Sequence, residues 1–154
     1  MREIGVGYDG SPESEHALRV ARQLATELGT KLSAFEAAAF RAPSLDAALL
    51  PLSDAVDALV DQARNRIASL GGVEPHAAYG QPAEELAVYS ASLDLLIVGS
   101  RGYGPLGRLI HGSTSQELAR RARCPLLVLP RSAPTSEEPE PPERRAGGAI
   151  ASKG

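Results

Sequence analysis

The chain has 154 residues, about the length of one domain, and its 43% hydrophobic and 23% charged residues are ordinary proportions for a globular protein. A net charge of −3 argues against a nucleic-acid-binding protein, which needs a strongly basic face, but it leaves room for a local anion site. No stretch approaches the roughly 20 apolar residues that cross a bilayer, and no signal-peptide pattern follows Met1. We therefore expect a cytoplasmic protein that binds neither nucleic acid nor membrane.

The single cysteine, Cys124, excludes an internal disulfide and a cysteine-based metal cluster. The three histidines, His16, His76 and His111, lie far apart and show no metal-ligand spacing. The sequence thus predicts a scaffold without a protein-held metal.

The composition changes near residue 131. Residues 131–154 combine prolines and mixed charge with no apolar periodicity, so they cannot bury enough surface to offset the entropy lost on ordering. We predict a folded domain at 1–130 and a disordered tail at 131–154, which is dispensable for fold and ligand binding.

Within residues 1–130, two hydrophobic periods alternate along the chain. Short apolar runs bounded by turn residues predict strands at 4–8, 31–39, 73–79, 95–98 and 126–129. Apolar residues at helical spacing predict helices at 12–28, 46–70, 82–91 and 117–123. This alternation predicts an α/β fold, a single doubly wound parallel sheet with helices on both faces. Ligands of such sheets bind beyond the carboxyl ends of the strands, where the strand order reverses.

The segment after the fourth predicted strand, residues 99–114, is rich in glycine and leads into a helix. From Leu95 to Gln116 there is no Asp or Glu, while Arg101, Arg108 and His111 can add positive charge. Backbone N–H groups of such a loop, together with a helix N-terminus, can cradle an anion. The loop therefore predicts a ligand that carries phosphates.

The common phosphate-binding motifs fit this sequence poorly. A P-loop is excluded because Arg108 follows Gly107 where Lys and Ser or Thr are required. The G-x-G-x-x-G matches at 102–107 and 5–10 lack the acidic residue or the leading strand of a dinucleotide site. One spacing remains, Gly99-x2-Gly102-x9-Gly112-Ser113.

That spacing matches the G-x2-G-x9-G-(S/T) signature of the ATP-binding universal stress proteins. Residues 6–14 also resemble the opening strand and turn of that family, and residues 124–129 resemble its closing strand. The resemblance covers roughly residues 2–130. It implies five parallel strands in the order 3-2-1-4-5, a homodimer, and ATP bound with Mg²⁺ or Mn²⁺ between strands one and four.

The resemblance also implies residue roles. Asp9 corresponds to the acid that contacts the ribose, Gly7 and Tyr8 to backbone beside the adenine, and Ala37 to a position that touches the base. The remaining implied nucleotide contacts lie at the end of strand four and along the loop: Val98, Gly99, Arg101, Gly102, Gly112, Ser113 and Thr114. Gly112 and Ser113 would meet the β- and γ-phosphates. The second strand departs from the family because residues 32–37 lack its usual histidine-valine pair.

Structural roles explain some of these residues equally well. Asp9 is suited to cap a turn. The hydroxyl of Ser113 can cap the following helix, with Gln116 reaching back in a capping box. The glycines can serve a loop without a ligand.

Three functional hypotheses remain. The favoured one is an ATP-binding regulatory protein of the stress response that acts through homodimerisation and an unidentified protein partner. The second is a slow ATPase or phosphotransferase; no catalytic residue is assigned, because the loop has no acid and His111 is the lone candidate base. The third is a stress-linked scaffold with an empty site. In the implied strand order, residues 126–129 form an apolar edge strand, so we expect the dimer to form through residues 125–130.

Overall fold

The computed structural model describes residues 1–39, 52–100 and 113–130. Its elements, in chain order, are β1 (Glu3–Gly7), α1 (Pro12–Leu28), β2 (Lys31–Ala38), α2 (Leu52–Ala68), β3 (Glu74–Tyr79), α3 (Pro82–Tyr89), the 3-10 turn η2 (Ser90–Ser92), β4 (Leu95–Gly99), α4 (Ser113–Arg121) and β5 (Leu126–Leu129).

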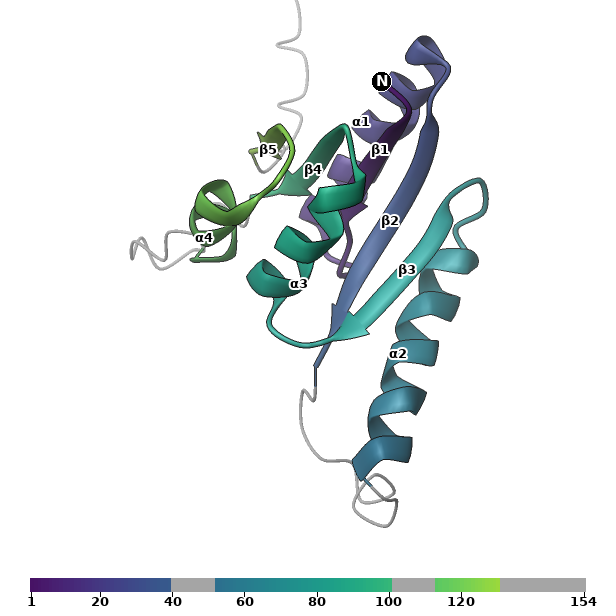
Figure 1. Cartoon of the computed structure of the whole chain (residues 1–154). Coiled ribbons are helices and arrows are strands. Elements are labelled where there is room, and N and C mark those ends of the chain that lie inside the picture. The colour runs from purple at the N-terminus through teal and green to yellow at the C-terminus, as the bar shows by residue number, and fades with distance from the viewer. Residues whose placement is uncertain (40–51, 101–112, 131–154) are drawn as a thin grey trace, which may run out of the picture.

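The five strands form one parallel sheet in the order β3-β2-β1-β4-β5 (Figure 1). Both the parallel sheet and this strand order are therefore confirmed. The chain first builds outward from β1 through β2 to β3, and then returns to the other side of β1 with β4 and β5. The order consequently reverses between β1 and β4, and this is the switch point at which such sheets bind ligands.

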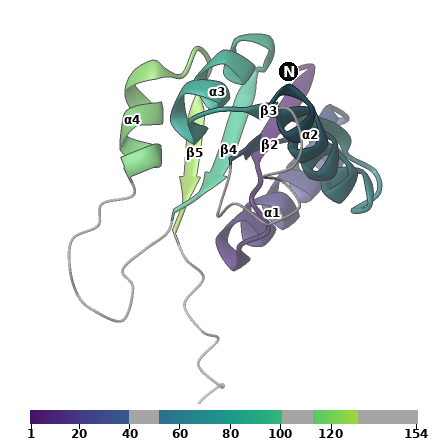
Figure 2. The ribbon, with the colours of Figure 1, turned by 90° about the horizontal axis from the view of Figure 1, so that it is seen from below.

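Helices cover both faces of the sheet (Figure 2). On one face α1 packs on β1 and β4 while α2 packs on β2 and β3; on the other, α3 lies against β2 and α4. Alternating strand residues supply the two apolar cores. The core beneath α1 contains Ile4, Val6, Ala34 and Ile97, and the core beneath α3 and α4 contains Phe35, Leu86, Leu96 and Leu118.

Most predicted boundaries differ from the structure by at least one residue, and the bounds at 12–28 and 126–129 agree. The predicted strand 4–8 is β1 at 3–7, although the Tyr8 N–H still donates to the Phe35 carbonyl at 2.9 Å. The predicted helix 46–70 is described from 52 to 68, and its first residues fall outside the described range.

The helix predicted at 117–123 was placed wrongly, since α4 runs from Ser113 to Arg121. The Arg123 N–H donates to the buried Ser90 hydroxyl at 2.8 Å. This bond draws the chain out of the helix and toward β5. Among the described residues, no helix is long and apolar enough to cross a membrane.

Candidate functional site

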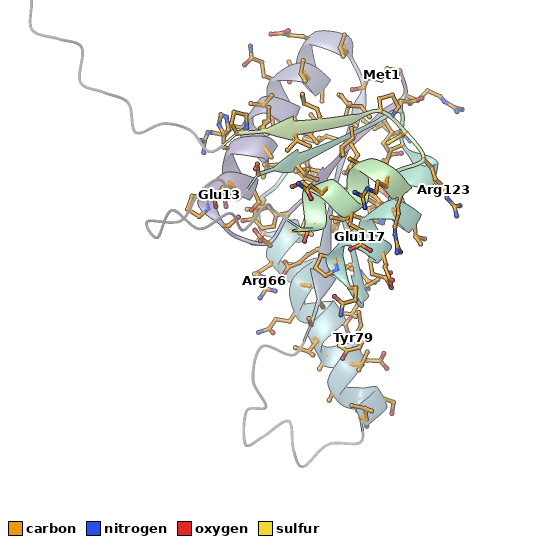
Figure 3. All side chains as sticks on the ribbon, turned by 90° about the vertical axis from the view of Figure 1, so that its left-hand side faces the viewer. Met1, Glu13, Arg66, Tyr79, Glu117 and Arg123 are labelled. Atoms are coloured by element: carbon orange, nitrogen blue, oxygen red, sulfur yellow. The ribbon has the colours of Figure 1, made fainter. Side chains whose placement is uncertain are left out.

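The switch point brings together the segments that follow β1 and β4. Figure 3 shows Glu13, in the first turn of α1, at the end of the sheet toward which the strands run, whereas Met1 lies at the other end. The Ser100 N–H donates to the Leu129 carbonyl at 2.7 Å, which ties the end of β4 to β5. Gly99 at the end of β4 packs against the Glu13 backbone, so segments far apart in the sequence meet at one edge.

Asp9 holds the turn that follows β1. Its Oδ1 accepts a hydrogen bond from the Ser11 N–H at 2.9 Å, and its own N–H donates to the Ser14 hydroxyl at 3.3 Å. Gly10 completes the turn with a φ of +76°, a conformation that side chains disfavour. The turn-capping role considered for Asp9 is therefore present in the turn that follows β1.

Ser11 caps α1 at the same edge. Its hydroxyl oxygen accepts from the Ser14 N–H at 3.2 Å, and Pro12 occupies the first helical position, where no N–H is needed. The N-terminus of α1 thus faces the switch point with a fixed geometry.

Tyr8 is buried directly behind this turn. Its hydroxyl donates to Glu15 Oε1 at 2.5 Å. Burial, reinforced by the hydrogen bond to Glu15, raises the pKa of Tyr8 to about 12, so the phenol stays protonated at neutral pH. Because the Tyr8 N–H already donates to Phe35, that N–H is not available to a ligand.

A second polar pair lies beside Tyr8 and was not predicted from the sequence. Glu36 of β2 is only 7% exposed at its side chain, and Arg66 of α2 binds it through both Nε, at 3.2 Å, and Nη2. The hydrogen bond to Glu36 raises the pKa of Arg66 further above its ordinary value. A charged residue between the apolar residues Phe35 and Ala37 of β2 was the signal that could have revealed it.

Close packing explains two of the predicted site glycines. A Cβ on Gly99 would lie 2.5 Å from the Glu13 carbonyl oxygen, and one on Gly7 would lie 3.0 Å from Val98 Cγ1 and 3.3 Å from Leu86 Cδ2. The first contact lets α1 approach β4, and the second lets α3 approach the sheet. Packing alone therefore requires the glycine at position 99, whereas a Cβ at Gly7 would need the Val98 and Leu86 side chains to shift by a few tenths of an ångström.

Two other predicted contacts contribute to the core beneath α3 and α4. The Val98 side chain is buried there, and Ala37, one residue before the end of β2, is half-buried against the same cluster. Contact with a nucleotide base by either residue stays a prediction.

The predicted phosphate-binding residues are described least. Arg101, Gly102 and Gly112 lie outside the described residues. Ser113 is the first residue of α4, and Thr114 is half-buried in the first turn of that helix. The structure describes the backbone of Ser113 but not its side chain. The structure thus describes the β1 side of the site and the end of β4, and the roles of the phosphate loop stay predictions.

Comparison with known proteins supports the family suggested by the motifs. The model of the universal stress protein family matches residues 1–130. A universal stress protein of Thermus aquaticus is 31% identical over 138 residues, which cover 84% of this chain and 98% of the relative. One of Mycobacterium tuberculosis is 34% identical over 137 residues, covering 82% of this chain but 45% of the relative, so the chain spans less than half of that protein.

A solved structure agrees with these matches. It is described as a universal stress protein in complex with cAMP, is 29% identical with a TM-score of 0.55, and the match covers 85% of this chain and 98% of that one. The family match spans the whole sheet and the switch point, and the two relatives exceed 30% identity over about four fifths of the sequence. The chain belongs to the universal stress protein family.

Proposed function

We propose that this protein binds ATP, with Mg²⁺ or Mn²⁺ held mainly through the phosphates, at the switch point between β1 and β4. One observation carries the proposal: the Gly99-x2-Gly102-x9-Gly112-Ser113 spacing starts at the end of the strand beside which the sheet order reverses. A related protein at 29% identity is described with cAMP, another adenine nucleotide.

The described residues fit a nucleotide at this edge. Asp9 places a carboxylate at the end of β1, where it can accept hydrogen bonds from ribose hydroxyls. The α4 N-terminus begins at Ser113, directly after the last signature glycine, and a helix N-terminus favours phosphate. The metal ion, when bound, would neutralise phosphate charge, and phosphate oxygens would supply most of its ligands.

The regulatory part of the proposal rests on β5. This strand forms an open edge of the sheet, and its end is hydrogen-bonded to the end of β4 at the switch point. A homodimer formed through residues 125–130 would therefore lie next to the nucleotide. Nucleotide occupancy can then alter the dimer surface offered to a protein partner in the stress response.

The proposed function predicts that Gly102→Val and Gly112→Val abolish ATP binding. A β-branched side chain at either position blocks close approach of the phosphates and disfavours positive φ. Calorimetric titration with ATP and Mg²⁺ measures the effect, and nucleotide released from the denatured native protein identifies the ligand. Gly107→Val, in the same loop but outside the signature, is the matched control and should bind nearly as well as the parent. Equal ATP affinity in all four proteins would refute the site.

A second prediction concerns Ser113. If its hydroxyl meets the terminal phosphates, Ser113→Ala should weaken ATP binding by roughly tenfold, the value of about 1.5 kcal/mol for a hydrogen bond to a charged group. AMP lacks those phosphates and should bind unchanged. Ser115→Ala in the same helix serves as the control. Equal losses for ATP and AMP would instead assign Ser113 to capping the helix.

A further inference from the structure

A polar cluster joins β1 and β3 across β2. Glu3 of β1 and Glu74 and His76 of β3 each offer one ligand atom, and these atoms all lie within 4.8 Å of one another. His76 Nε2 is 3.6 Å from Glu74 Oε1. Figure 1 shows β2 lying between β1 and β3, the two strands that carry the cluster.

The parallel register explains why residues so distant in sequence meet. Ser33 of β2 is the Cα partner of both Gly5 of β1 and Glu74 of β3, so it lies between β1 and β3. Those strands are two spacings apart, roughly 10 Å. Because Ser33 is small and fully buried, the longer side chains of Glu3, Glu74 and His76 can reach over it toward one another.

A second layer of hydrogen bonds holds Glu3. The Ser33 hydroxyl donates to Glu3 Oε1 at 2.7 Å and lies 2.5 Å from the Tyr89 hydroxyl. The Ser33 hydroxyl has one proton, which it donates to Glu3. The hydrogen bond between Ser33 and Tyr89 is therefore donated by the Tyr89 hydroxyl. Burial raises the pKa of Tyr89, which keeps that proton in place.

Aromatic packing fixes Tyr89 over the cluster. Its ring centroid is 5.0 Å from that of Phe35, with which it stacks, and 5.6 Å from that of His76. A Cβ on Gly5 would lie 2.8 Å from the Tyr89 hydroxyl, so the glycine provides the space for this contact. The carboxylate of Glu3 is thus oriented in the way that outer-shell partners orient metal ligands.

We propose that Glu3, Glu74 and His76 form a binding site for a divalent transition-metal ion, with Zn²⁺ as the best match. Two carboxylate oxygens and one imidazole nitrogen suit Zn²⁺, which binds both at about 2.0–2.2 Å. Tetrahedral ligands at those distances are roughly 3.3 Å apart. The Glu74–His76 distance is already close to this value.

The cluster is open to solvent on one side. This lets the ion enter and lets the ligand atoms move closer together around it. The Glu74 side chain is 61% exposed and that of His76 is 40% exposed, so both can adjust while Glu3 stays anchored. A fourth position faces water, as in zinc sites with three protein ligands. Glu3 and Glu74 are the first residues of β1 and β3, whereas His76 is level with Phe35 and Gly7. None of the three is among the residues proposed to hold the nucleotide.

Zinc titration of the full chain, free of tags and stripped of metal, tests the proposal. Competition with a chromophoric chelator should reveal one tight equivalent of Zn²⁺ in the parent protein. His76→Ala and Glu74→Gln each remove one ligand, and each should weaken zinc binding at least tenfold. His16→Ala, on the surface of α1, and Asp9→Ala, at the nucleotide site, should retain the parent affinity.

Thermal unfolding gives a second readout. Zinc should raise the melting temperature of the parent and of His16→Ala but not of His76→Ala, because an ion that binds only the folded state stabilises it. Glu74→Gln alters an exposed side chain, so its zinc affinity remains interpretable if His76→Ala fails to fold. The proposal is overturned if the parent takes up no zinc equivalent, or if Glu74→Gln binds zinc as tightly as the parent.

Discussion

Val128→Pro is expected to convert a homodimer into a monomer or an aggregate. The parent chain should scatter light as a particle of twice its 16.1 kDa mass. This follows from the proposed pairing of two β5 strands across a twofold axis, in which the same strand edge serves both protomers.

The hydrogen bonds of β5 show which of its groups point outward. The Pro125 carbonyl accepts from the Leu96 N–H at 3.0 Å, and the Leu129 carbonyl accepts from the Ser100 N–H at 2.7 Å. Because backbone groups of successive strand residues point to alternate sides, the Val128 N–H points to the open edge of the sheet. Proline there deletes an edge donor without removing a bond to β4.

Matched variants separate pairing from folding. Val128→Ala keeps the N–H and should remain dimeric. Val128→Lys also keeps the N–H but places a charge on a side chain that is 37% exposed at the edge, and it should yield a folded monomer. Circular dichroism verifies the fold of each variant. A monomeric parent, or a dimer that survives both the proline and the lysine, would contradict this interface.

Gly99→Ala is expected to lower the free energy of unfolding by about 3 kcal/mol, at the upper end of typical overpacking costs. The added Cβ would sit 2.5 Å from the Glu13 carbonyl oxygen, a backbone atom that cannot move aside unless α1 shifts on the sheet. For a chain of this size the melting temperature should fall by roughly 10 °C. Urea unfolding measures the difference directly.

Ser100→Ala is the neighbouring control and should change stability little. If Gly99→Ala has the same melting temperature as the parent, α1 can move away from β4 without loss of stability. The packing explanation for this glycine is then wrong. The result also bears on the nucleotide site. Loss of ATP binding in a Gly99 variant would report a displaced helix, so Gly102 and Gly112 are the better probes of phosphate contact.

Local patterns were sufficient to predict the elements. The Ser11-Pro12 start of α1 and the apolar run of β4 appear in the structure where the sequence placed them, because capping chemistry and hydrophobic periodicity act over a few residues. The strand order came from the family resemblance of the loop signature, and it too is confirmed. The predicted end of α4 was wrong because the chain leaves the helix where Arg123 contacts Ser90, which is 33 residues away. Its predicted start, residue 117, lies four residues after the observed one at Ser113.

The sequence by itself determined the α/β fold and the family, since hydrophobic periodicity and the loop spacing are local patterns, and it predicts where the nucleotide binds. Only the tertiary structure decided that Gly99 is required by α1, that Glu36 is paired with Arg66, and that Glu3 lies beside Glu74 and His76. The physical reason is the parallel register. It places side chains from separate strands on one face and within a few ångströms, and no local pattern in the sequence encodes which of them meet.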